Sequence, residues 1–190
     1  FAESGIYLPL EESRDNLIRA AGNYGIDMEP LEEEGQVYIL DLGKMRAEST
    51  TEEELEWGLI SFETLQDFLD NHLSFSNAKR LVIDSVTAAG LYYSSAEKLR
   101  REMFRFARFL KEKDITCLLI TETNGPALTR YGIEQFIADS LIVLGYEQVG
   151  GEFRRSVAVH KMRFTRHDGV RHPFLILQNG IEISPDEFLS

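Results

Sequence analysis

The residue that first suggests chemistry is Asp84, which ends the short apolar run Arg80–Asp84. Leu81, Val82 and Ile83 show no polar alternation, which is typical of a parallel strand buried on both faces. Open α/β sheets bind ligands at the carboxyl ends of such strands. A carboxylate there is suited to hold Mg²⁺, directly or through water, beside nucleotide phosphates. The alternative is a polar residue that only ends the strand and caps the following turn.

Polar side chains also lie at the ends of two other predicted strands, residues 5–10 and 115–121. They are Glu11, Glu12, Thr121 and Glu122. Because parallel strands end at the same edge of a sheet, we expect these groups to converge with Asp84. Clustered carboxylates can hold a metal or polarise an attacking water. Glu11 and Glu12 can equally begin a helix, where acidic side chains favour the helix dipole, and both interpretations can hold together.

A basic segment from Arg154 to His172 stands out in a chain of net charge −12. Within it, Lys161 and Arg163 are two residues apart in a predicted strand, so they should point the same way. Thr165 and His167 follow at the same spacing, and two cations with two polar groups on one face suit a phosphate chain. The competing interpretation is an edge strand protected by its charges.

One nucleotide motif does not occur in the sequence. No Gly-x-x-x-x-Gly-Lys-[Ser/Thr] is present, since Gly43-Lys44 has neither the first glycine nor the hydroxyl. We therefore expect the group that cradles a β-phosphate to lie outside these 190 residues. The chain begins at Phe1 without an initiator Met, so we expect that it has lost its beginning.

The elements that must position these groups alternate between strand and helix up to residue 144, which indicates βαβ units and a parallel sheet. Three helices are expected to follow caps at Ser13, at Thr51 with Glu54, and at Ser94 with Glu97. After Gly150-Gly151 only turns separate the strands, so these should be antiparallel and extend one side of the sheet. The predicted strands are residues 5–10, 36–42, 80–84, 115–121, 140–144, 153–162, 174–177 and 181–184, in a single domain covering 1–190.

Composition limits the partners and the compartment. The content of 43% hydrophobic and 27% charged residues is typical of a globular protein. The sequence has no run of 18 apolar residues, so it predicts no membrane span. The charge of −12 argues against nucleic acid and anionic membranes. A lone Cys117 in an apolar run favours a buried thiol in a reducing, cytoplasmic setting.

Several motifs together resemble the KaiC-type branch of the RecA-like ATPases. Their order and spacing cover nearly the whole chain, and the sequence lacks only the P-loop segment. The resemblance implies a three-layer αβα sandwich with a mainly parallel central sheet and antiparallel C-terminal strands. The motifs are GIYLPLEES at 5–13, RLVIDSVT at 80–87, RYGIEQF at 130–136, HKMRFTRH at 160–167 and PFLILQNGI at 173–181.

The resemblance also implies roles for the residues singled out above. Glu11 and Glu12 match the catalytic carboxylate pair that activates water, and Asp84 matches the Walker B aspartate that serves Mg²⁺. The cations of the basic segment match groups that reach the ATP of a neighbouring subunit in a hexameric homo-oligomer. The residues implied to lie near the nucleotide are Lys161, Arg163, Thr165, His167, Thr121 and Glu122.

The resemblance predicts an ATP-binding protein that hydrolyses ATP between subunits in a regulatory or signalling role. Gln135 and Phe136 stand where the clock-protein kinase domain has adjacent Ser and Thr phosphorylation sites, which favours hydrolysis over autokinase activity. Two alternatives stay open: a non-catalytic oligomerising scaffold that has lost its P-loop, and a recombinase-like DNA-binding ATPase. The sequence identifies no protein partner.

Overall fold

The computed structural model describes residues 3–40, 42, 60–123 and 127–189. The described chain divides into two compact units. One combines residues 1–22 with 26–133, and the other combines 23–25 with 134–190. We call them the parallel-sheet unit and the antiparallel-sheet unit and describe each by itself. The predicted cap at Thr51 with Glu54 lies outside the described residues.

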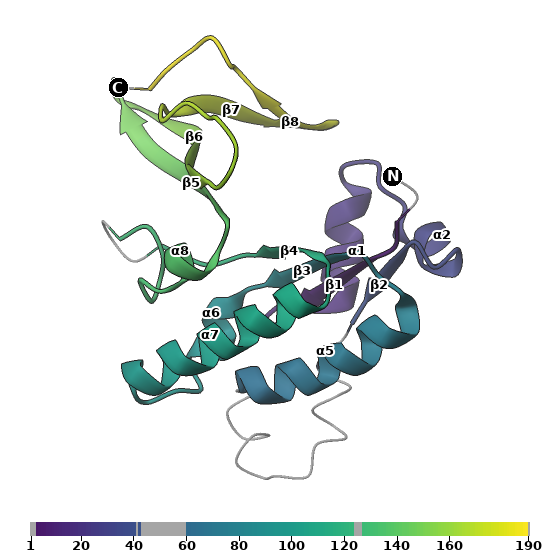
Figure 1. The fold of residues 1–190 in the computed structure, drawn as a ribbon. Helices are drawn as coiled ribbons and strands as arrows, with labels where there is room; N and C mark the ends of the chain where they lie inside the picture. The colour runs from purple at the N-terminus through teal and green to yellow at the C-terminus, as the bar shows by residue number, and fades with distance from the viewer. Residues whose placement is uncertain (1–2, 41, 43–59, 124–126, 190) are drawn as a thin grey trace. The chain divides into compact units, whose positions relative to one another are not determined.

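The first unit is built on a four-stranded parallel sheet in the order β2-β1-β3-β4 (Figure 1). All three strand pairs are parallel, as the alternation of strands and helices predicted. Alternate residues of the two central strands form the core: Ile6, Leu8, Leu81 and Ile83 are at most 2% exposed. The strands are β1 (Gly5–Pro9), β2 (Val37–Ile39), β3 (Arg80–Asp84) and β4 (Thr116–Leu119).

Two long helices, α5 (Phe62–Ser76) and α7 (Ala96–Glu112), run side by side in this unit (Figure 1). Each buries an apolar stripe that includes Leu65 and Leu69 on α5 and Met103 on α7. Such stripes are the reason amphipathic segments form helices against a sheet. The remaining helices are α1 (Arg14–Gly22), α2 (Met28–Glu33) and the short α6 (Val86–Gly90).

Of the predicted helix caps, the structure corrects one and confirms one. Ser61 caps α5 by accepting a hydrogen bond from the Thr64 amide at 3.0 Å, so α5 begins at Phe62. Helix α7 is capped by Ser95, which accepts from the Lys98 amide, and the predicted cap at Ser94 is wrong by one residue. The predicted cap at Ser13 is confirmed, since its hydroxyl accepts from the Asn16 amide at 3.4 Å.

The second unit is an antiparallel sheet in the order β5-β6-β7-β8, preceded by the short helix α8 (Glu134–Ile137). Its longest pair is a hairpin turned at Gly150 and Gly151, both with positive φ, a backbone conformation that glycine adopts without steric cost. Among the described residues these strands form a sheet of their own. They do not extend the parallel one as predicted, since β5 pairs with β6 and with no strand of the parallel sheet. The strands are β5 (Ser140–Val149), β6 (Glu152–Met162), β7 (His172–Leu177) and β8 (Gly180–Ile183).

The architecture is thus the α/β fold that the sequence predicted, with a parallel sheet, its helices and antiparallel strands at the C-terminal end of the chain. No helix within the described ranges combines the length and the apolar character needed to cross a membrane.

Candidate functional site

The strands β1 and β3 end side by side, and this brings Asp84 and Glu11 together. Pro9 is the register partner of Asp84, and the Leu10 amide donates to the Asp84 carbonyl at 2.6 Å. One residue further on, the Ser85 hydroxyl donates to Glu11 Oε2 at 2.9 Å. The peptide bond between Asp84 and Ser85 is cis. The two acidic groups predicted to meet at this edge of the sheet therefore lie at adjacent strand ends.

Tyr7 is a member of this cluster that the sequence analysis missed. Its hydroxyl donates to Asp84 Oδ2 at 2.8 Å, so one carboxylate oxygen of Asp84 is held from within the sheet. Burial raises the pKa of Tyr7 above its ordinary value, and the hydrogen bond to Asp84 and the charges of Asp84 and Glu12 add to the shift. The charge of Glu12 thus acts on the same corner of the site. Tyr7 therefore stays a neutral donor at physiological pH.

The third strand end, that of β4, is joined to the beginning of α6. The buried Thr87 hydroxyl accepts from the Glu122 amide at 3.2 Å and lies 3.5 Å from the Thr121 hydroxyl. The Val86 amide donates to the Ile120 carbonyl at 2.9 Å and holds the same two segments together. Thr121 and Glu122 therefore lie beside the segment that follows Asp84, as the convergence of strand ends predicted.

A further contact joins two motifs that are far apart in the sequence. Tyr131 donates its hydroxyl to the Thr87 carbonyl at 2.8 Å. Its ring lies so close to Gly90 that a Cβ added there would be 2.2 Å from Tyr131 Cε2. Only glycine fits this approach, so the Arg130-Tyr131-Gly132 motif packs directly on the helix that leaves the strand end of Asp84.

The cations of the antiparallel-sheet unit have partners inside that unit. Lys161, on β6, donates to the carbonyls of Gln135 and Ala138 at 2.9 and 2.7 Å, at the end of α8. Arg163 forms an ion pair with Asp139 at 2.8 Å, in which both side chains are about half exposed. The ammonium of Lys161 is thus held by neutral acceptors, while Arg163 makes a surface pair of the kind that is readily exchanged.

The prediction that Thr165 and His167 lie on the same strand face as Lys161 and Arg163 is wrong. Strand β6 ends at Met162, and the chain then turns through Phe164, whose φ is +63°. A left-handed residue interrupts the extended backbone, and side chains alternate regularly only in an extended strand. Thr165 donates its amide to the Met162 carbonyl, and His167 Nδ1 lies 2.8 Å from the Asp168 carbonyl.

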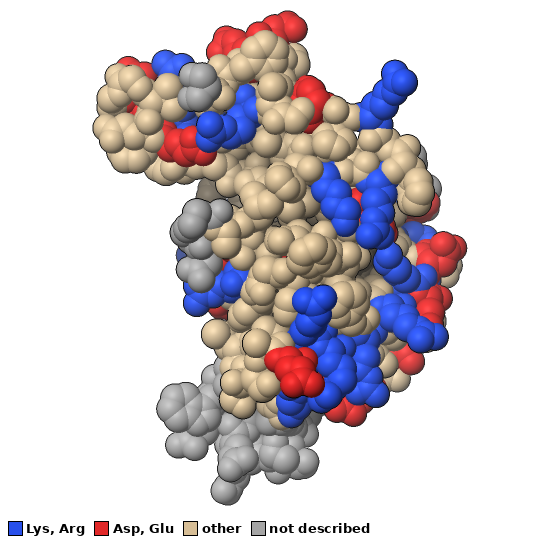
Figure 2. Space-filling view, turned by 60° about the vertical axis from the view of Figure 1, so that its left-hand side comes forward, with Lys and Arg blue, Asp and Glu red and all other residues tan. Residues whose placement is uncertain are grey.

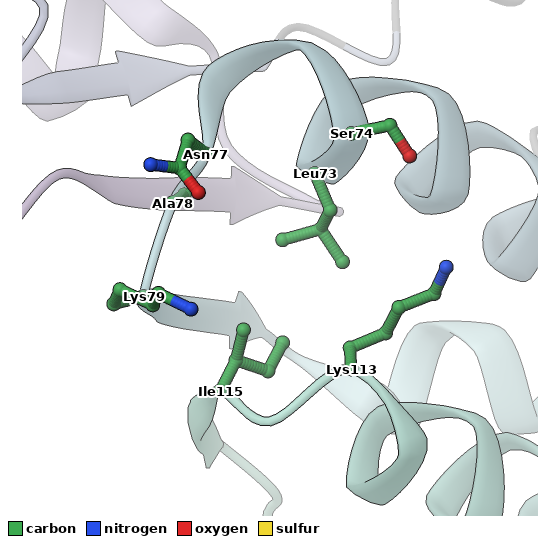
Figure 3. A pocket seen from close by; sticks show the side chains of 7 residues that line it. All are labelled: Leu73, Ser74, Asn77, Ala78, Lys79, Lys113 and Ile115. Atoms are coloured by element: carbon green, nitrogen blue, oxygen red, sulfur yellow. The ribbon is translucent and has the colours of Figure 1, made fainter.

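A small hollow in the parallel-sheet unit lies away from this cluster (Figure 3). It has a volume of about 130 Å³ and is lined by residues that include Leu73, Lys79, Lys113 and Ile115. Lys79 directly precedes β3, so the hollow lies at the amino end of that strand, opposite to Asp84. Sites for small molecules are usually at least twice this size. The strand ends around Asp84 remain the candidate site.

The chemistry of the carboxylates suits Mg²⁺. Nucleotide-bound Mg²⁺ takes one or two protein carboxylates, and phosphate and water supply its other ligands. Within the described ranges no group of three or more His, Cys, Asp or Glu could hold a metal by itself. Asp84, with one oxygen bound to Tyr7, fits such a site as its protein carboxylate, while Glu11 is held beside it by Ser85.

The fold and this arrangement of strand-end carboxylates define an α/β domain of the RecA-type ATPase class. A model of the KaiC ATPase family matches residues 1–188, and this chain belongs to that family. The chain is 34% identical over 188 residues to the circadian clock oscillator protein KaiC of Parathermosynechococcus lividus. It is 33% identical to KaiC 1 of Synechocystis sp. over the same length.

A solved structure is similar over nearly the whole chain. A KaiC-like protein from Pyrococcus horikoshii OT3 superposes with a TM-score of 0.80 at 33% identity, covering 96% of this chain and 76% of that one. The KaiC matches span 97% of this chain, and the chain spans about a third of the length of those relatives.

Proposed function

We propose that this chain supplies the carboxylate side of a Mg²⁺–ATP site in a KaiC-like ATPase. The observation that carries the proposal is the pairing of the ends of β1 and β3, which makes Pro9 the register partner of Asp84 and lets Ser85 bond to Glu11. Family membership makes ATP the expected ligand, since the matching family is an ATPase family. The sequence has no Walker A motif, so the phosphate cradle is expected from a segment outside these residues.

In this proposal the residues at the ends of β3, β1 and β4 have different roles at the ATP site. Asp84 orients Mg²⁺, directly or through water, while Tyr7 fixes the carboxylate by its hydrogen bond. Mg²⁺, when bound, neutralises charge on the phosphates. Glu11 and Glu12 polarise the attacking water, and the Ser85 hydroxyl orients Glu11 for this task. Thr121 and Glu122 lie beside the nucleotide at the end of β4.

The basic segment is proposed to act on the ATP held by a neighbouring copy in a homo-oligomer, for which a hexameric ring is the expected form. Arg163 can exchange its exposed pair with Asp139 for phosphate oxygens, because such pairs contribute only about 0–1 kcal/mol. Lys161 is proposed to reach the same nucleotide, with Thr165 and His167 close by. We propose a regulatory or signalling ATPase that works in the cytoplasm.

The experiment is ATP hydrolysis by the full-length protein with Glu11→Gln and Glu12→Gln together. General bases contribute roughly 10²- to 10⁴-fold, so we expect kcat to fall by at least about 100-fold while nucleotide binding persists. Glu33→Gln with Glu34→Gln, at the end of α2, is the matched control and should leave turnover unchanged. An unchanged rate in the Glu11/Glu12 variant would show that the catalytic assignment is wrong. Self-association without any wild-type hydrolysis would favour the scaffold.

A further inference from the structure

The helix α7 carries a concentration of positive charge on an acidic protein. It contains six Lys or Arg and three Glu residues, a net charge of +3, whereas the whole chain has −12. Figure 2 shows Lys and Arg side chains gathered over the part of the molecule that this helix occupies. We define the α7 basic face as five of its six exposed cations and its exposed aromatic ring: Arg100, Arg101, Phe104, Arg105, Arg108 and Lys111.

The face includes an exposed aromatic ring covered by a guanidinium. Arg100 lies over the ring of Phe104 at 5.3 Å, and Phe104 is 41% exposed. Among the residues that the structure describes, Arg100 has no carboxylate partner. Arg100, Phe104 and Arg108 follow one another four residues apart and so form one stripe along the helix. Arginine and aromatic side chains together are the types that dominate binding energy at protein interfaces.

Three other arginines of the face form ion pairs with glutamates of the same helix. Arg101 and Arg105 share the single carboxylate of Glu102 at 3.3 Å each. Arg108 pairs with Glu112, and the two side chains are 82% and 62% exposed. An exposed helical ion pair contributes about 0.3–0.5 kcal/mol, so a carboxylate from a partner can replace that of Glu112 at little cost. Glu102 is only 12% exposed, so Arg101 and Arg105 keep this carboxylate and can offer their remaining N–H donors to a partner.

We propose that the α7 basic face is a docking surface for an acidic protein segment, one that presents carboxylates to the arginines and an apolar residue to Phe104. This inference does not depend on the ATPase proposal. A phosphate polymer, which carries negative charge at every unit, fits the face less well, because Glu97 and Glu112 are exposed on the same helix. A protein segment can match the cations and avoid the two glutamates. The stripe from Arg100 to Lys111 is about 16 Å long, enough for three turns of a partner helix.

The test is binding of a fluorescein-labelled 15-residue peptide, with Glu and Leu at helical spacing, to the full-length protein. We expect binding at about 50 mM salt that weakens as salt is raised, because the contacts are at the surface. Arg100→Glu with Arg105→Glu should weaken it by at least about tenfold. Phe104→Ala should weaken it several-fold without changing its salt dependence, because it removes only the apolar contact.

The matched control is Arg19→Glu with Lys79→Glu, which changes the net charge equally at exposed sites on other elements. It should change the affinity by less than about twofold, because neither residue belongs to the α7 basic face and long-range effects are screened by salt. Equal losses in the two double variants, or no binding by the wild type, would overturn the proposal. Tighter binding of a single-stranded 15-mer oligonucleotide or of phosphatidylserine vesicles than of the peptide would overturn the class of partner.

Discussion

The contact between Gly90 and Tyr131 allows a quantitative test of how the Asp84 segment is held. A Cβ at Gly90 would lie 2.2, 2.4 and 2.6 Å from three atoms of Tyr131, all in the ring end that donates to the Thr87 carbonyl. Overpacking costs about 1–3 kcal/mol. Displacing the tyrosine hydroxyl adds about 1 kcal/mol for the lost hydrogen bond. We therefore expect Gly90→Ala to lower the free energy of unfolding by about 2–4 kcal/mol.

The second half of the test is a double-mutant cycle with Tyr131→Ala, which removes the ring. In that background the methyl group introduced by Gly90→Ala meets no clash, and alanine is favoured over glycine in a helix by up to about 1 kcal/mol. The same change should therefore be neutral or slightly stabilising there. The coupling energy between the two positions should be about 2–5 kcal/mol, which is measurable by urea unfolding followed by circular dichroism at 222 nm.

Gly22→Ala is the matched control. Gly22 is also the last residue of its helix, and a Cβ added there would have nothing within 4 Å. This variant should be at least as stable as the wild type. If Gly90→Ala costs no more than Gly22→Ala, or costs the same with and without the tyrosine ring, the packing argument is refuted.

Three further predictions concern single side chains. Ser85→Ala should lower kcat several-fold with little change in KM in the full-length protein, because it frees the Glu11 carboxylate but removes no nucleotide contact; an equal rise in KM would contradict this. Burial raises the pKa of the Cys117 thiol to about 12, so at pH 8 the native protein should react with a disulfide reagent about a thousandfold more slowly than the urea-unfolded chain. The stability that this raised pKa contributes is present below the unfolded value of about 9 and is lost as pH rises towards 12, and equal native and unfolded labelling rates would show that the thiol is exposed. Lys161→Met should speed hydrogen exchange at the amides of α8, because it leaves the Gln135 and Ala138 carbonyls without their charged donor, while Arg163→Met should not.

The strands were predictable where a local pattern determines them. Arg80–Asp84 was predicted with its observed bounds, because an apolar run between charged residues leaves little choice of register. The β5 strand was predicted only to residue 144 and runs to Val149. Its extension depends on pairing with β6, and the sequence of β5 alone carries no signal for that pairing.

The site was predictable in outline and not in detail. Polar residues at the ends of parallel strands were expected to converge, and Ser85 does join Glu11 to the segment after Asp84. The contacts of Tyr7 and Tyr131 were missed, because each depends on which strand or loop becomes a neighbour in space. The turn at Phe164 was missed for a different reason: a left-handed conformation in a residue other than glycine has no reliable sequence signature.

The central claim is that Asp84 is the carboxylate that serves Mg²⁺ at an ATP site. The most direct measurement is Mg²⁺-dependent ATP hydrolysis by the full-length protein carrying Asp84→Asn. Asparagine keeps an oxygen that can accept the Tyr7 hydroxyl, so the fold is preserved while the negative charge is lost. We predict that turnover falls by at least about 100-fold and that higher Mg²⁺ concentrations partly restore it. Turnover within twofold of the wild type at every Mg²⁺ concentration would contradict the assignment.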